Sequence, residues 1–318
     1  MGHTRWLVRR AQLGLQRRTL FNEPHEQQRK ALAAVGVGCL AGALGSLVGM
    51  GGAFITIPFL THPLFGLPQR VAQGTSMASV LATASGGVVG YTKMSLFSSS
   101  SKSASSKSAP KPYFIGNISV PTTILVSSAS MITAIAGAKF STKLSNRHLK
   151  ITLAIFMLCV APSPFLRQYL ANIDKDVEQM KSITATTIDW FDELRRSLLI
   201  GAFSGFQAGL YGVGGGAVVV PALCLFTDLT YKESLGTSLA IMLPTAIAGS
   251  MQHYRQGTMV RNIAIPLGVG CFLGSFIGGS LVTRSLNASE EKKLKYCFTG
   301  VMVALGLKTL RDGLRYVK

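Results

Sequence analysis

Two glycine-rich stretches lie inside the most apolar parts of this chain, 163 residues apart. Their glycines are Gly49, Gly51 and Gly52 in the first stretch, and Gly212, Gly214, Gly215 and Gly216 in the second. Glycine tolerates positive φ and lets a ligand approach the backbone closely. An interrupted helix exposes backbone N–H groups with a partial positive charge, and such groups bind anions. The doubled motif therefore predicts part of a binding site for a small anion.

A second motif follows each glycine stretch and adds hydroxyl groups. It is Gly74-Thr75-Ser76 in the first half and Gly236-Thr237-Ser238 in the second half, 162 residues later. Each motif opens an apolar segment, where hydroxyls and the N–H groups of a helix start can hold oxygen atoms. We assign these six residues to the same anion site. The structural alternative is that Thr and Ser cap helices, while glycines at Gly-x-x-x-Gly spacing elsewhere form packing faces.

Five further residues complete the candidate set. Pro58 and Pro221 follow the two glycine stretches, and we predict that they break the helix there. Lys93 and Arg255 occupy matching positions in the two halves, which suits a gate that attracts anions; snorkelling to the membrane surface is the alternative. His253 is a candidate proton carrier, although a lone His is more often structural.

The charge and cysteine content argue against several functions. No Asp or Glu occurs between Glu26 and Asp174, and none lies in the core of any long apolar segment. Carriers coupled to cations or protons usually place a carboxylate within the membrane. The five cysteines form no CxxC or Cys/His cluster, so we expect neither a metal nor a cofactor. No constellation of His, Cys and acids suggests an enzyme.

Long apolar segments must position these motifs. The chain has 318 residues, of which 48% are hydrophobic and 14% charged, and its mean hydropathy is +0.36. Crossing a bilayer takes roughly 20 apolar residues. We predict an all-α, polytopic membrane protein with about eight transmembrane segments, or eight to ten if the glycine-rich segments are half-helix pairs. The predicted segments are about 31–61, 72–92, 114–138, 149–170, 197–226, 234–252, 260–283 and 293–311.

The matching motifs divide the chain into two tandem copies. The first copy spans 31–171 and the second 197–318, with a polar linker at 172–196. A Ser-rich insert at 95–112 occurs only in the first copy and is typical of a flexible loop. If each glycine-rich segment crosses once, the copies are parallel; if it forms a hairpin, they are inverted. The distribution of Lys and Arg over the two sides favours eight single crossings.

The net charge of +19 is spread mainly over short segments between apolar runs. That placement fits membrane orientation and lipid contact, and argues against nucleic-acid binding. Residues 1–30 are rich in Arg and poor in acids. They fit either a mitochondrial presequence or a basic cytoplasmic tail, so the inner mitochondrial membrane, the plasma membrane or another cellular membrane is the expected location. The expected partners are the lipid bilayer and a small anionic substrate, and the sequence leaves the oligomeric state open.

The motifs carry a family resemblance. GMGGAFITIP from Gly49 and GVGGGAVVVP from Gly212, each followed by GTS, resemble the sulfite exporter TauE/SafE family, also described as toluene-sulfonate uptake permeases. The resemblance spans roughly 31–312. It implies a duplicated membrane transporter of about eight helices that carries sulfur-containing anions such as sulfite and organosulfonates. The first motif has GMGGA where the fuller GxGGG form occurs only in the second copy, which leaves the substrate and the direction open.

Secondary transport of a small, sulfur-containing anion is therefore the predicted function. A non-transporting scaffold or assembly protein is the main alternative, because glycine faces also pack partners. An anion channel and a membrane-embedded enzyme are further alternatives.

Overall fold

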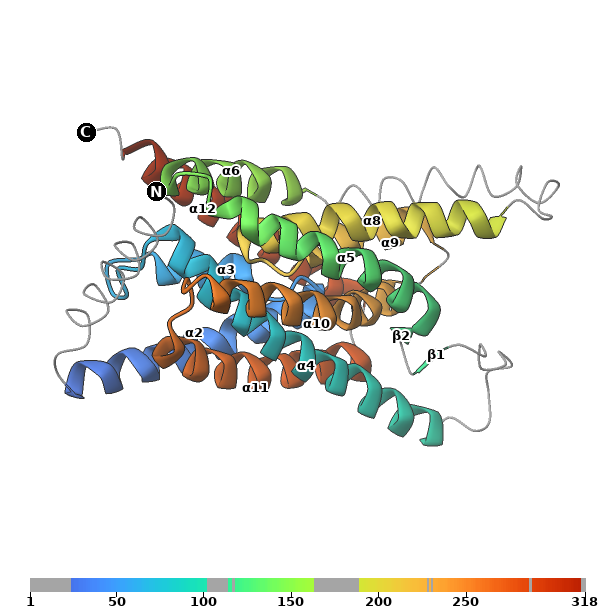
Figure 1. Cartoon of the computed structure of the whole chain (residues 1–318). Helices are drawn as coiled ribbons and strands as arrows, with labels where there is room; N and C mark the ends of the chain where they lie inside the picture. Colours follow the sequence, from blue (N-terminus) through green and yellow to red (C-terminus); the bar gives the residue numbers. More distant parts are fainter. Residues whose placement is uncertain are drawn as a thin grey trace.

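The computed structural model describes residues 24–101, 114–115, 118–162, 189–227, 229, 231–285 and 288–315. These residues form ten helices and one pair of two-residue strands, β1 (Phe114–Ile115) and β2 (Ile118–Ser119) (Figure 1). The first copy contains α2 (Pro24–Val48), α3 (Ala53–Leu60), α4 (Gln69–Ser101), α5 (Val120–Ser141) and α6 (Asn146–Val160). The second contains α8 (Asp189–Tyr211), α9 (Gly216–Phe226), α10 (Tyr231–Arg255), α11 (Arg261–Ser285) and α12 (Ala288–Arg315). The predicted all-α fold is confirmed.

Four of these helices are long and apolar enough to cross a membrane. The spans are Gln27–Val48, Val120–Ser141, Glu233–Arg255 and Arg261–Leu281. Large apolar side chains such as Ile132 and Ile265 are exposed on them, at 72% and 66%, as lipid-facing residues are expected to be. The chain is therefore an integral membrane protein, and membrane crossing by the other predicted segments stays a prediction.

Both glycine-rich segments are hairpins. In the first, Gly49, Gly51 and Gly52 have φ angles of 71°, 78° and 70°. A Cβ placed on Gly52 would lie 2.2 Å from the carbonyl oxygen of Ala41, eleven residues earlier, so the chain turns back along α2. The second copy repeats this turn, because a Cβ on Gly215 would lie 2.8 Å from the carbonyl oxygen of Ser204. Each segment is thus a long helix followed by a short re-entrant helix.

The prolines do not make these breaks, contrary to the prediction. Pro58 lies inside α3 and Pro221 lies inside α9. In both copies the chain leaves the helix earlier, at the glycines, where positive φ ends the preceding helix. Each proline then sits in the sixth position of a short helix.

Close glycine contacts set the helix directions. Gly270, Gly274 and Gly278 of α11 approach the carbonyl oxygens of Val35, Cys39 and Ala43 of α2. The residue numbers on the two helices rise together in steps of four, so α2 and α11 are parallel. Their backbones pack directly against each other, as small residues at this spacing allow. Gly86 and Gly90 of α4 contact Phe272 and Phe276 of α11 in the same sense. We call α2, α4 and α11 the first bundle.

A second set of parallel helices is built in the same way. Gly201, Gly205 and Gly209 of α8 approach the carbonyl oxygens of Val126, Ser130 and Ala134 of α5. α10 runs parallel to α5, since Thr237 meets Ser119 at one end and Thr245 meets Ser130 farther along. We call α5, α8 and α10 the second bundle.

The two bundles run in opposite directions. Across the seam between them, Gly249 of α10 faces Met77 of α4, while Leu239 of α10 faces Gly87 of α4, so these helices are antiparallel. Because α4 and α10 are equivalent in the two copies, the copies are inverted. The preference for eight single crossings in parallel copies is therefore wrong.

Two segment boundaries differ from the expected ones. α4 continues to Ser101, so Ser95–Ser101 of the Ser-rich insert are helical. α8 begins at Asp189, so the last part of the predicted linker forms its first two turns. The rest of the insert, the rest of the linker and the basic residues 1–23 lie outside the described residues.

Candidate functional site

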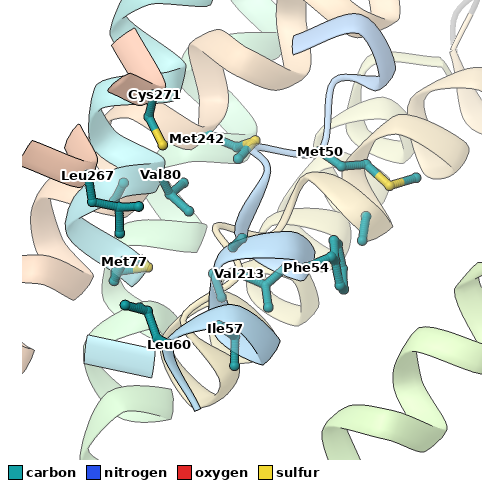
Figure 2. Close-up of a cluster of buried hydrophobic side chains, with 14 of the residues drawn as sticks. Met50, Phe54, Ile57, Leu60, Met77, Val80, Val213, Met242, Leu267 and Cys271 are labelled. Carbon is teal, nitrogen blue, oxygen red and sulfur yellow. The ribbon is translucent and has the colours of Figure 1, made fainter. Parts of the chain in front are cut away.

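The tips of the two hairpins meet at the centre of the molecule. A Cβ on Gly51 would lie 2.2 Å from Met242 Cε and 3.3 Å from Val80 Cγ1. A Cβ on Gly214, the equivalent glycine, would lie 2.3 Å from Val80 Cγ1 and 2.7 Å from Met242 Cε. Val80 and Met242 are themselves equivalent positions of α4 and α10, and Figure 2 shows both within the central cluster of buried apolar side chains. The predicted glycines of the two copies therefore face one centre.

The tips also touch each other directly. Gly216 begins α9, and a Cβ there would lie 2.5 Å from the carbonyl oxygen of Gly49 and 2.9 Å from Met50 Cα. Neither α3 nor α9 has a side-chain cap, because Gly52 and Gly215 occupy the N-cap positions. Two uncapped helix N-termini thus lie close together, each with a partial positive charge.

The serines of the GTS motifs tie each tip to the opposite copy. Ser76 Oγ donates to the carbonyl oxygen of Gly212 at 3.3 Å and lies 2.8 Å from Thr56 Oγ1. Ser238 Oγ donates to the carbonyl oxygen of Gly49 at 2.9 Å. Both serines are fully buried. The motif of one copy therefore holds the hairpin of the other.

The threonines make a second reciprocal pair. Thr75 Oγ1 accepts from the backbone N–H of Val260 at 3.2 Å, just before α11 begins. Thr237 Oγ1 accepts from the N–H of Ser119 at 3.0 Å, just before α5 begins. Both threonines are buried, so each caps a helix start of the opposite copy. The capping alternative is thus realised, but between copies and not within a helix.

Thr75→Val should lower the free energy of unfolding by about 1–3 kcal/mol, because the buried N–H of Val260 loses its acceptor. Thr75→Ser keeps an oxygen at that position and should cost less. Thermal unfolding of the purified variants in one detergent measures the difference. Equal unfolding temperatures for the Val and Ser variants would contradict this role of the hydroxyl.

His253 makes a contact that its counterpart in the first copy also makes. Its Nε2 lies 3.1 Å from the carbonyl oxygen of Gly209, and its Nδ1 lies 3.0 Å from Thr258 Oγ1. In the first copy, Tyr91 stands at the equivalent position and donates to Ser46 O at 3.1 Å. Ser46 and Gly209 are also equivalent. The contact of His253 with Gly209 holds α10 against α8. The role of His253 as a proton carrier stays a prediction.

The remaining candidates lie away from the tips. Lys93 is near the end of α4 and Arg255 is the last residue of α10. Because these helices are antiparallel, the two cations stand at opposite ends of the molecule and cannot form one gate. Gly74 packs on the backbone of Thr258, and Gly236 is buried beside Thr237.

Sequence reasoning missed the two side chains at the centre and one beside it. Val80 and Met242 are apolar and carry no chemical signature, but the offset of 162 relates them. Gln73 directly precedes the first GTS motif and is fully buried, and neither polar atom of its side chain has a hydrogen-bond partner in the part of the chain that the structure describes. A Gln within an apolar segment was the available signal.

Two inverted copies, each with a re-entrant half-helix that reaches a shared centre, form an architecture used by secondary transporters. The chain belongs to the Sulfite exporter TauE/SafE family, whose model matches residues 34–101 and 95–309. The predicted family is thereby confirmed.

Curated relatives agree with this family. YunE of Bacillus subtilis is 24% identical over 87% of this chain and 96% of its own length, and MJ0441 of Methanocaldococcus jannaschii is 24% identical over 85% and 92%. YdhB of Bacillus subtilis is 23% identical over 75% and 85%. Each is named a probable membrane transporter protein. No solved structure shows significant similarity to this chain.

Proposed function

We propose that this protein is a secondary transporter of small anions, with sulfur oxyanions such as sulfite and small sulfonates as its substrate class. One observation carries the proposal: two uncapped helix N-termini from inverted copies meet at the centre. Their partial positive charges favour an anion there without a buried cationic side chain.

The surrounding groups suit the same ligand. Thr75 and Thr237 use their oxygens as acceptors, and among the described residues neither hydroxyl proton has an acceptor. Because the two threonines lie toward opposite ends of the antiparallel helices α4 and α10, each can donate to an oxyanion on its own side of the centre. No Asp or Glu of the described residues is buried. A site without carboxylates does not repel an anion, and it offers no obvious ligand for a cation.

Val80 and Met242 now fill the space between the tips. An anion can bind at this centre only when these side chains move apart, which a displacement of one bundle against the other would achieve. Met is unbranched and adapts easily to such a change. The arrangement seen here is accordingly the occluded one in our proposal, and Lys93 and Arg255 would draw the anion toward the two opposite mouths.

The sulfur chemistry of the substrate rests on the family description, which names sulfite. The relatives are named only as membrane transporters. The inner mitochondrial membrane as location rests on residues 1–30 alone, and it remains a prediction.

Flux of ³⁵S-sulfite and of a labelled small sulfonate into proteoliposomes tests the proposal. We expect saturable uptake that speeds up when unlabelled sulfite is loaded inside, as for a carrier. Thr75→Val combined with Thr237→Val should lower the flux at least about tenfold, since the anion then loses one hydrogen bond on each side of the centre. The matched Thr75→Ser and Thr237→Ser pair should retain most of it.

Three results would count against the proposal. Uptake that rises linearly and is indifferent to internal sulfite would indicate a channel. Absence of flux, together with no thermal stabilisation by any anion, would indicate a scaffold. Unchanged flux in the double Val variant would remove the threonines from the site.

A further inference from the structure

We infer that a cavity of about 330 Å³, at the end of the molecule where α4 begins, is a second binding site for a small oxyanion. The inference rests on the proposed function and adds an outer site on the route to the hairpin tips. Residues of the loop between α3 and α4 line the cavity on one side, and Asn146, Arg147 and Lys150 of α6 line it on the other.

Gln69 gives the strongest indication of a ligand. It lines the cavity, is only 1% exposed, and among the described residues neither its Nε2 nor its Oε1 has a hydrogen-bond partner. A buried amide without partners is costly, and both of its polar atoms are shielded from solvent, so the side chain would turn toward a ligand in the cavity and be satisfied by it. Its Nε2 can donate two hydrogen bonds to oxygen atoms.

The charges around the cavity select an anion. Arg147 is exposed at its rim, and Lys150, 9% exposed, lines it farther in. A guanidinium is suited to bidentate contact with an oxyanion, and an ammonium adds a point charge. Asp312 lies beside Lys150, offsets part of its charge and lines a separate, smaller cavity, while none of the described residues that line this cavity is a carboxylate.

A polar stripe on α4 leads from this cavity toward the second hairpin. Gln69, Gln73 and Ser76 share one face of α4 at helical spacing. Gln73 is fully buried, and its side-chain amide also has no partner within the described ranges. Its backbone oxygen would lie 2.3 Å from a Cβ on Gly212. Ser76 then bonds to Gly212 itself. In the second copy Leu235 occupies the position equivalent to Gln73, so the stripe on α10 that matches the polar stripe of α4 is interrupted by an apolar residue.

The test compares three variants in flux and in equilibrium binding of ³⁵S-sulfite to detergent-solubilised protein. Arg147→Gln and Gln69→Leu should each raise the half-saturating sulfite concentration about tenfold, the loss of one hydrogen bond to an anion, and leave the maximum flux within about twofold. Lys143→Gln is the matched control, because Lys143 is exposed at the same end but does not line the cavity. It should change neither quantity.

The outcomes separate this inference from the proposed function. Normal sulfite transport with unchanged half-saturation in both cavity variants would overturn the outer site alone. An equal effect of Lys143→Gln would also overturn it, since general surface potential would then explain the change. If the wild type shows no flux at all, the proposed function fails, yet loss of sulfite binding in Arg147→Gln and Gln69→Leu would still support the outer site.

A phospholipid headgroup offers the same chemistry as a free oxyanion. Thermal unfolding in a zwitterionic detergent, with either sodium sulfite or phosphatidylglycerol added, distinguishes the two sources. Stabilisation by sulfite that disappears in Arg147→Gln supports the inference. Stabilisation by phosphatidylglycerol only, lost in the same variant, would overturn it in favour of a lipid site.

Discussion

Gly52→Ala should destabilise the protein far more than the same change at Gly257, although both residues have a φ of 70°. At Gly257 no atom of the described residues lies within 4 Å of the added Cβ, so only the cost of a left-handed Ala remains, about 1–2 kcal/mol. At Gly52 the Cβ would meet the carbonyl oxygen of Ala41 at 2.2 Å, within rigid helix backbone. Overpacking adds about 1–3 kcal/mol, for a total of roughly 2–5 kcal/mol. Thermal unfolding in one detergent measures all three proteins.

Gly215→Ala provides an intermediate case. Its Cβ would approach the carbonyl oxygen of Ser204 at 2.8 Å, and the φ of Gly215 is 83°. The expected order of destabilisation is therefore Gly52, then Gly215, then Gly257. Equal losses at all three positions would mean that backbone conformation alone matters and that the close approach of each hairpin to its own long helix does not.

A disulfide across the seam between the bundles should stop transport. In a background without the native cysteines, Met77→Cys and Gly249→Cys place thiols on α4 and α10, where a Cβ on Gly249 would lie 3.3 Å from Met77 Cγ. That separation is compatible with disulfide geometry. If the bundles must move against each other, the oxidised protein should transport sulfite at least about tenfold more slowly, and reduction should restore the rate.

The control disulfide lies within one bundle. Ser130 Oγ and Thr245 Oγ1, on α5 and α10, are 2.5 Å apart, so Cys at both positions should also form a bond. This bond leaves the seam free, and oxidation should change the flux little. Peptide mapping without reductant establishes that each bond has formed. Full activity of the oxidised Met77→Cys/Gly249→Cys protein would refute movement at this seam, whereas inhibition by both bonds would mean that the second bundle must itself deform.

Much of the architecture was predictable from the sequence because membrane segments are long and apolar. The predicted segment 31–61 contains most of α2 and all of α3, and the segment 260–283 nearly coincides with α11. The doubled motif also identified the two copies. These features are local, and length and composition carry them.

The hairpins and the inversion were not predictable in the same way. A glycine-rich segment of about 30 residues fits one broken crossing as well as a hairpin. The contact of Gly52 with Ala41 shows that the segment is a hairpin, and the antiparallel contact of α4 with α10 shows that the copies are inverted. Such contacts depend on the packed structure and have no counterpart in a count of charges.

The site was predictable in part. The sequence identified the hydroxyl and glycine motifs, but it did not reveal that Ser76 binds the hairpin of the other copy or that Thr237 caps α5. Val80 and Met242 escaped notice because an apolar side chain in an apolar segment carries no signal. Their role depends on where the inverted copies meet.

The parallel packing of α2 with α11 also has a consequence for synthesis. The small-residue face of α2, including Gly38 and Gly42, is covered by α11 near Leu267 and Cys271, more than 200 residues later. The ribosome therefore makes and inserts the whole first copy before that face can find its partner. Until α11 has been made, that face of α2 lacks the partner that it has in the folded protein, so the first bundle can be completed only late in synthesis.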